Sequence, residues 1–319
     1  MWYTEDMKIS SILFRSYLLS AAFIAVFLGV FLHLQLVSAD SSGTSVSVVN
    51  ATPAVSNVVI SSDPITLTEN TTTTVTITAT ISDGNGCSDV FSSGTISAVL
   101  YRSGVAATSS CTADDSNCYR SITLVDTGGT CTGGTDTSGN ASGTVPMQYF
   151  AEATDASSTF PTQWWVAFVK ASDFASASST ATSTAATELN SLYALNITGS
   201  ISYGSVAAGA DTGASNQTAT VTNTGNFKID SEFSGTNMTD GSNTINATQQ
   251  KYATSSVTYA SLTFNLSTTA TARDINIVKA TSSSTPSTQG TFWGIAIPNG
   301  QVAGSYTGTN TFTAVYSSN

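Results

Sequence analysis

The sequence predicts an all-β fold of two tandem β-sandwich domains. Apolar residues alternate with Thr in many short runs, most clearly over residues 73–81 (TTVTITATI), and a period of two is that of a half-buried strand. Turn residues separate these runs, as at Asp63-Pro64 and over residues 83–86 (DGNG). Residues 44–173 show no helical periodicity, so short antiparallel strands are expected there, and the later runs are interpreted in the same way, with a short helix as an alternative at the Ala-rich residues 174–187.

The chain begins with a predicted export segment, residues 1–39. Lys8 and Arg15 give it a positive start, and an apolar stretch covers residues 17–36. Residues 37–39 (VSA) are the small residues that a signal peptidase reads, which predicts a cleaved signal peptide. An uncleaved signal anchor is the alternative, because about 20 apolar residues are enough to cross a bilayer. In both cases the rest of the chain is expected outside the membrane.

The first predicted domain covers residues 40–173 and the second covers residues 188–319. Residues 174–187 (FASASSTATSTAAT) have the composition of an interdomain linker. The strands expected in the first domain are residues 45–49, 55–61, 65–68, 73–81, 96–102, 119–125, 145–153 and 164–170. Those expected in the second are residues 192–203, 217–223, 227–233, 256–266, 274–278, 291–297 and 309–316.

The composition excludes some classes of function. The chain has a net charge of −11, and its nine Lys and Arg residues are scattered singly, so a nucleic-acid partner is not expected. The only histidine, His33, lies in the export segment, and its removal would leave no imidazole as a general base or metal ligand. We therefore expect no enzyme.

Carboxylate pairs are the remaining route to catalysis, because glycoside hydrolysis needs only Asp and Glu. Glu152 and Asp155 would face opposite ways on a strand, since their offset is odd. Asp230 and Glu232 would share a face, but they fit the solvent side of an alternating strand. Neither pair predicts an active site.

The four cysteines, Cys87, Cys111, Cys118 and Cys131, all lie in the first predicted domain. An even number in an exported protein predicts two disulfides, with three pairings open. A local bridge between Cys111 and Cys118 would leave Cys87 and Cys131 to join two loops. Zinc binding is the alternative, but there is no Cys-x-x-Cys pair and no histidine after the export segment.

Two features suggest ligands. Asp83, Asn85 and Asp89 lie in one Gly-rich loop, and such oxygen ligands suit calcium, which is the one candidate cofactor. The alternative is that Asp83 and Asn85 only form the turn. Trp164 and Trp165 would point to opposite faces of a strand, and Trp165 is the candidate to stack on a sugar if it is exposed. Core packing is the alternative for it.

Short motifs in both predicted domains carry a resemblance. They are residues 78–90 (TATISDGNGCSDV), 221–226 (VTNTGN) and 303–308 (AGSYTG), the last followed by residues 311–315 (TFTAV). These stretches resemble strand-and-turn signatures of immunoglobulin-like domains in exported bacterial and archaeal surface proteins. The resemblance implies two tandem immunoglobulin-like sandwiches in a cell-envelope setting.

The expected function is that of an exported structural or adhesive protein of the cell surface, such as a surface-layer, filament or adhesin subunit. Its expected partners are other surface proteins, further copies of the chain that join by strand addition, or glycans. The membrane is a partner only through an uncleaved N-terminal segment. A secreted carbohydrate-binding module is the alternative.

Overall fold

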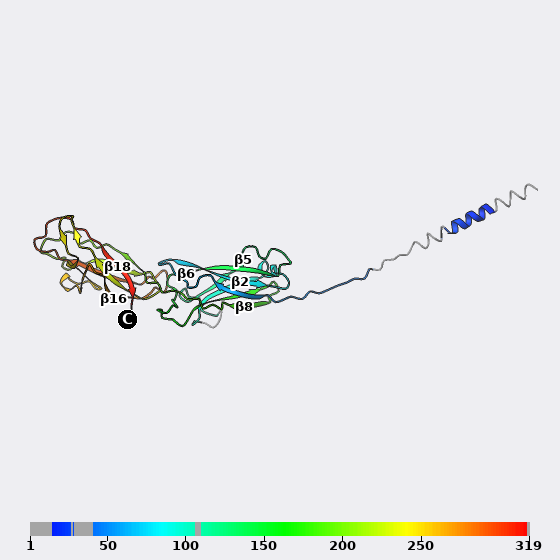
Figure 1. The fold of residues 1–319 in the computed structure, drawn as a ribbon, viewed down its shortest axis with the longest axis horizontal. Coiled ribbons are helices and arrows are strands. Elements are labelled where there is room, and N and C mark those ends of the chain that lie inside the picture. Colours follow the sequence, from blue (N-terminus) through cyan, green and yellow to red (C-terminus); the bar gives the residue numbers. More distant parts are fainter. Residues whose placement is uncertain (1–14, 27, 29–40, 106–109, 318–319) are drawn as a thin grey trace, which may run out of the picture. The chain divides into compact units, whose positions relative to one another are not determined.

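The computed structural model describes residues 15–26, 28, 41–105 and 110–317 (Figure 1). Residues 15–26 are helical. Among the described residues, no helix combines the length and the apolar character needed to cross a bilayer. His33 and the predicted cleavage site at residues 37–39 lie outside the described residues. The chain divides into two units, Met1–Val49 and Asn50–Asn319.

The second unit is all-β, as predicted, and its sheets are antiparallel. Its two largest hydrophobic clusters among the described residues are separate from each other, and we call them the first and the second core. We call residues 50–192 the first sandwich and residues 193–317 the second sandwich. Leu192 packs against the first core and Tyr193 against the second, which places the boundary between these two residues.

The first sandwich has two four-stranded sheets and one short helix, α2 (Ser88–Phe91). One sheet has the order β1 (Ala54–Ile60), β2 (Thr72–Ser82), β6 (Ser138–Gln148) and β5 (Val125–Asp126). The other has the order β4 (Cys118–Thr123), β3 (Thr95–Arg102), β7 (Trp165–Ser172) and β8 (Ser178–Thr182).

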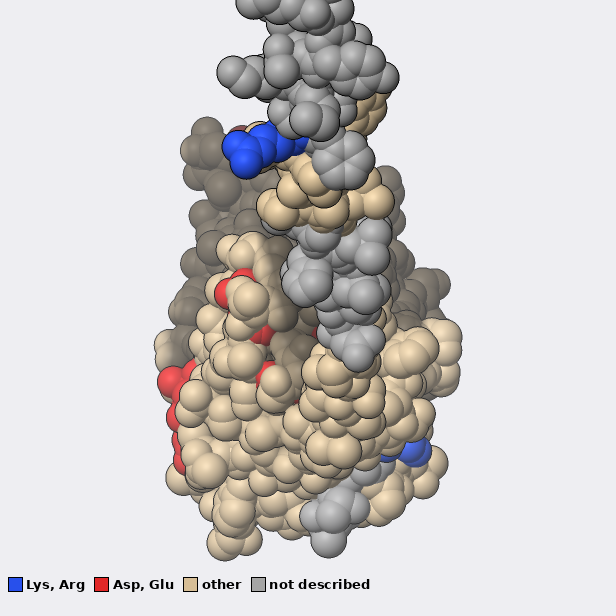
Figure 2. Space-filling model, turned by 90° about the vertical axis from the view of Figure 1, so that its right-hand side faces the viewer, with Lys and Arg blue, Asp and Glu red and all other residues tan. Residues whose placement is uncertain are grey.

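Strand β2 shows why the Thr-rich runs fold as they do. Val75, Ile77 and Ile81 are fully buried, whereas the Thr residues between them face outward or are half-buried. The β-branched Thr side chains fit the pleated outer surface. Figure 2 shows one face of the molecule on which few charged side chains appear, in keeping with the 9% of charged residues in the sequence.

The prediction that residues 174–187 form an interdomain linker is wrong. These residues include β8, which pairs with β7 from Phe168↔Thr182 to Ser172↔Ser178. Thr187 accepts a hydrogen bond from the backbone of Trp165 at 2.8 Å, and Leu189 is fully buried in the first core. Backbone pairing at a sheet edge does not need large apolar side chains, so a low-complexity composition concealed this strand.

The second sandwich pairs a five-stranded with a three-stranded sheet. The larger sheet has the order β15 (Phe264–Asn265), β14 (Gln250–Ala253), β17 (Thr288–Ile295), β10 (Gln217–Asn223) and β9 (Leu195–Thr198). The smaller has the order β16 (Thr271–Ile277), β11 (Ile229–Gly235) and β18 (Asn310–Tyr316). Strands β12 (Met238–Thr239) and β13 (Thr244–Ile245) form a hairpin, and the short 3₁₀ helices η1 (Ala247–Gln249) and η2 (Tyr259–Ser261) lie in connections.

Three predicted strands are corrected. Residues 65–68 form no strand of the described structure, since only Ile65 pairs there, in an isolated bridge with Leu189. Residues 256–266 contain η2 and only the two-residue β15, because the chain turns at Tyr259–Ser261 and strand pairing resumes at Phe264. Residues 45–49 belong to no strand of the described structure. There Val46 and Val48 are 88% and 79% exposed.

Candidate metal centre

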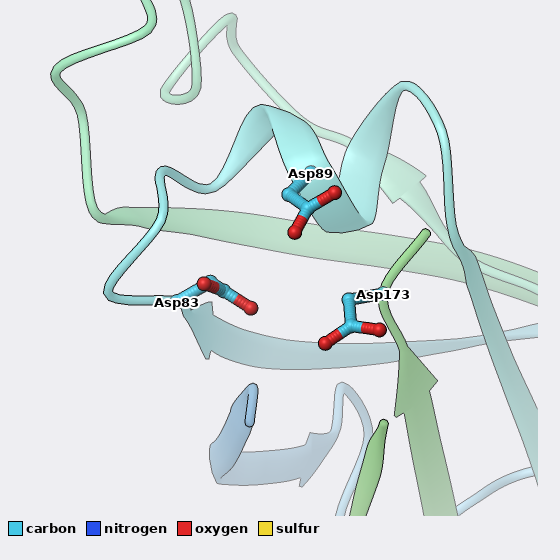
Figure 3. Close-up of side chains that lie close together, drawn as sticks. All are labelled: Asp83, Asp89 and Asp173. Atoms are coloured by element: carbon cyan, nitrogen blue, oxygen red, sulfur yellow. The ribbon is translucent and has the colours of Figure 1, made fainter. Parts of the chain in front are cut away.

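Three carboxylates converge at one end of the first sandwich. Asp83, Asp89 and Asp173 each offer one carboxylate oxygen, and these oxygens lie within 4.8 Å of one another (Figure 3). Asp83 directly follows β2, and Asp173 directly follows β7, which belongs to the opposite sheet. Asp89 lies in α2. The cluster therefore joins both sheets and the helix between them.

A turn positions Asp83 and Asp89. The Asp83 Oδ1 atom accepts a hydrogen bond from the Asn85 backbone at 2.7 Å, which is the turn-forming role expected of an Asp. Gly86 follows with φ of 112°, a conformation that favours glycine. The Cys87 backbone donates to Asp136 O at 2.7 Å, and the Cys87–Cys131 disulfide anchors the start of α2.

Two segments that are distant from each other in sequence hold the Asp173 carboxylate by hydrogen bonds. Its Oδ1 accepts a hydrogen bond from the Ala177 backbone at 2.8 Å, and its Oδ2 accepts one from Asn50 Nδ2 at 2.8 Å. The neighbouring Ala51 backbone donates to Asn85 Oδ1. The first residues of the sandwich are therefore fastened to the same end as the three carboxylates.

The predicted calcium ligands were Asp83, Asn85 and Asp89, and the structure brings two of them together with a third carboxylate. Asp83 and Asp89 belong to the cluster. The Asn85 Oδ1 atom accepts a hydrogen bond from the Ala51 backbone N–H. Asp173 is the third member and was missed. Its only sequence signal is an Asp directly after a strand, the same position that Asp83 has after β2.

The electrostatics of the cluster are unfavourable without a partner. Asp83 and Asp173 are only 3% and 4% exposed, and ionised carboxylates whose oxygens lie within 4.8 Å of one another repel. Asp83 Oδ2 is buried and has no hydrogen-bond partner among the described residues. A buried polar atom without a partner costs free energy, so a cation is the natural complement.

The cysteines form the two disulfides Cys87–Cys131 and Cys111–Cys118, which resolves the pairing left open by the sequence. No cysteine of the chain is free, so the alternative of zinc binding at these residues is excluded. Disulfides persist in oxidising compartments, and two of them point to an extracellular environment.

Trp165 is not a surface ligand site. Its side chain is fully buried, and its Nε1 donates to the Glu152 carbonyl oxygen at 3.1 Å. The prediction that Trp165 binds a ligand is therefore wrong, because a buried indole cannot stack on a sugar. Alternation along the predicted strand, residues 164–170, assigned the two tryptophans to opposite faces but did not show which of them is buried. In the structure Trp164, which precedes β7, is 41% exposed.

Three of the four carboxylates in the predicted pairs, those of Glu152, Asp155 and Asp230, bind other groups of the protein. Glu152 forms an ion pair with Lys279 at 3.1 Å, and Asp155 accepts a hydrogen bond from the Ser191 backbone at 2.6 Å. Asp230 Oδ1 accepts two backbone hydrogen bonds, from Ile275 and Asn276, both at 3.0 Å. These bonds fix turns, a strand edge and a contact between sandwiches.

A second feature lies in the second sandwich, where the edge strands of its two sheets approach each other. Strands β9 and β18 each end a sheet, and a groove of about 540 Å³ lies beside them. Its apolar lining comes from β9, the segment after it, β12 and β18: Ile197, Ile201, Tyr203, Met238 and Phe312. These aliphatic and aromatic side chains are only partly covered.

No protein-family model matches the sequence, and no curated protein matches it. The resemblance to immunoglobulin-like surface proteins therefore stays a prediction.

Proposed function

We propose that this chain is an exported, non-catalytic structural protein of a cell surface that assembles with further copies by β-strand addition. We further propose that its two sandwiches are immunoglobulin-like and that residues 1–39 direct export. The observation that carries the proposal is the edge strand β18. Within the described part of the chain it pairs with β11 on one side and with no strand on the other.

An uncovered edge strand offers a row of backbone hydrogen-bonding groups to another chain. Natural proteins guard such edges with Lys, Pro or bulges, and β18 (NTFTAVY) contains neither Lys nor Pro. Its pairing with β11 is regular over all seven residues, from Ile229↔Tyr316 to Gly235↔Asn310. The adjacent groove adds apolar surface for alternate side chains of an incoming strand, as in other cases of strand addition.

The segment before the first sandwich supplies a matching strand. Residues 44–48 (TSVSV) alternate between Val and hydroxyl side chains, and a strand would place Val46 and Val48 on one face, with Ser45 and Ser47 on the other. The two valines are 88% and 79% exposed. Their insertion beside β18 of a second copy would bury them and complete the edge.

The experiment compares the assembly of the purified full chain by size-exclusion chromatography and electron microscopy. We expect ordered polymers from the unaltered protein and monomers from the double variant Val46→Lys/Val48→Lys, whose charges cannot enter an apolar groove. The matched control, Ser45→Lys/Ser47→Lys, alters the other face of the same segment and should still assemble. A monomeric unaltered protein, or equal loss in both variants, would refute strand addition by this segment.

A further inference from the structure

We propose that Asp83, Asp89 and Asp173 bind a calcium ion that fastens the two sheets of the first sandwich together at one end. This site is independent of the assembly proposed above, because it lies wholly within one sandwich and involves neither β18 nor residues 44–48.

The spacing of the three carboxylates fits one ion. Calcium–oxygen distances are about 2.3–2.6 Å, so two oxygens bound to the same ion lie at most about 5 Å apart. The three carboxylate oxygens lie within 4.8 Å of one another. One ion placed among them can therefore contact all three residues without a rearrangement of the backbone.

The uncompensated oxygen of Asp83 points to a ligand independently of this clustering. Asp83 is 3% exposed, and its Oδ2 has no hydrogen-bond partner among the described residues, although its Oδ1 is bonded within the turn. In Figure 3 the carboxylate of Asp83 is directed toward the space between Asp89 and Asp173. A bound cation would give this buried oxygen the partner that the protein does not provide.

The donor set selects the kind of ion. All three side chains offer only carboxylate oxygen, a ligand that suits calcium, magnesium and manganese rather than zinc or copper. Calcium accepts six to eight oxygens in flexible geometry, including bidentate carboxylates and water, whereas magnesium demands a near-ideal octahedron. Asp89 is half-exposed, so water can reach the ion from its side and complete an irregular calcium shell.

Binding would connect segments that are distant in sequence. The end of β2, helix α2 and the end of β7 each contribute one ligand, and Asn50 bonds to Asp173 from the start of the sandwich. Extracellular modules bind calcium with dissociation constants of about 10⁻⁴–10⁻³ M. We therefore infer that calcium outside the cell keeps this end of the sandwich closed.

The test is isothermal titration calorimetry with calcium chloride on the purified full chain after chelator treatment, together with thermal unfolding at each calcium concentration. We expect one calcium ion per chain, bound in the submillimolar range, and a higher melting temperature with calcium than with chelator. Magnesium at the same concentration should have a clearly smaller effect. An equal response to magnesium would overturn the assignment to calcium.

Variants locate the site. Asp173→Asn should weaken calcium binding at least tenfold, and Asp89→Asn should do the same with less risk to folding, because Asp89 is half-exposed. The control is Asp115→Asn, which removes one exposed carboxylate of the same sandwich outside the cluster. Two results would overturn the assignment of calcium to this cluster. One is a folded Asp89→Asn variant that binds calcium as well as the unaltered protein, and the other is an Asp115→Asn variant whose calcium binding is weakened equally.

Discussion

The Nζ atom of Lys279 in the second sandwich lies 3.1 Å from the Oε1 atom of Glu152 in the first sandwich. Its Nζ also donates to the Phe150 carbonyl oxygen at 3.0 Å, and the two charged side chains are only 16% and 20% exposed. Phe150 and Ala280, the residue after Lys279, are both fully buried in one small apolar cluster. An ion pair and an apolar contact thus join the two sandwiches at the same place.

Removal of this ammonium group should weaken the connection between the sandwiches. We expect Lys279→Ala to lower the free energy of unfolding by about 1–3 kcal/mol, because Glu152 and the Phe150 carbonyl lose a charged donor in a largely buried place. Chemical denaturation followed by circular dichroism measures this. Lys170→Ala removes an exposed lysine of β7 and is the control. Equal losses in the two variants would contradict a specific role for Lys279.

Reduction should affect the two sandwiches unequally. Both disulfides lie in the first sandwich, with sequence separations of 44 and 7 residues. In the chain-entropy model they stabilise it by about 4 and about 2 kcal/mol, respectively. We expect a reductant to increase hydrogen exchange in residues 50–192 much more than in residues 193–317. Similar increases in both would contradict this expectation.

The sequence predicted some elements closely because their side chains carry the pattern. Strand β10 begins and ends as expected, at Gln217 and Asn223. In β2 the sequence itself alternates between apolar residues and Thr. Strands β8 (SSTAT) and β14 (QKYA) were missed, because short strands held by backbone bonds between neighbours need no apolar alternation. The alternation of apolar and polar residues thus predicted the long strands. It did not predict the short strands, which form because a neighbouring strand pairs with them.

The candidate site shows the same limit. Asp83 and Asp89 share a loop, so the sequence could group them, but Asp173 joins them only because β2 and β7 end at the same end of two facing sheets. No local spacing encodes that relation. For the same reason the sequence could place Trp164 and Trp165 on opposite faces of the predicted strand, residues 164–170, whereas the rest of the fold determined which of the two is buried.

Gly94 occupies a place where no side chain fits. A Cβ atom there would lie 2.0 Å from the Ser172 carbonyl oxygen and 2.9 Å from that of Val90, and backbone cannot move aside as a side chain end can. We expect Gly94→Ala to destabilise the first sandwich by about 1–3 kcal/mol, measured as a lower urea midpoint. Gly134→Ala is the control, since nothing lies within 4 Å of its Cβ position. An unchanged midpoint for Gly94→Ala would show that the Ser172 contact relaxes.

Alkaline pH should destabilise the first sandwich through Tyr119. Burial raises the pKa of this phenol far above its usual value near 10, and its hydroxyl donates to the Asp115 carbonyl and accepts from the Gln148 backbone at 2.9 Å. The folded state therefore keeps the proton at a pH where the unfolded chain loses it. The stabilisation is complete below pH of about 10 and decreases as the pH rises further.

Replacement of Tyr119 by Phe isolates this effect. Tyr119→Phe removes the titrating group, so its free energy of unfolding should fall less between pH 10 and 12 than that of the unaltered protein. The variant should also lose about 1 kcal/mol at neutral pH, because the Gln148 backbone N–H loses its acceptor. Urea denaturation across this pH range measures both effects, with the exposed Tyr316→Phe as control. Parallel pH profiles for the unaltered protein and Tyr119→Phe would show that other groups cause the alkaline loss.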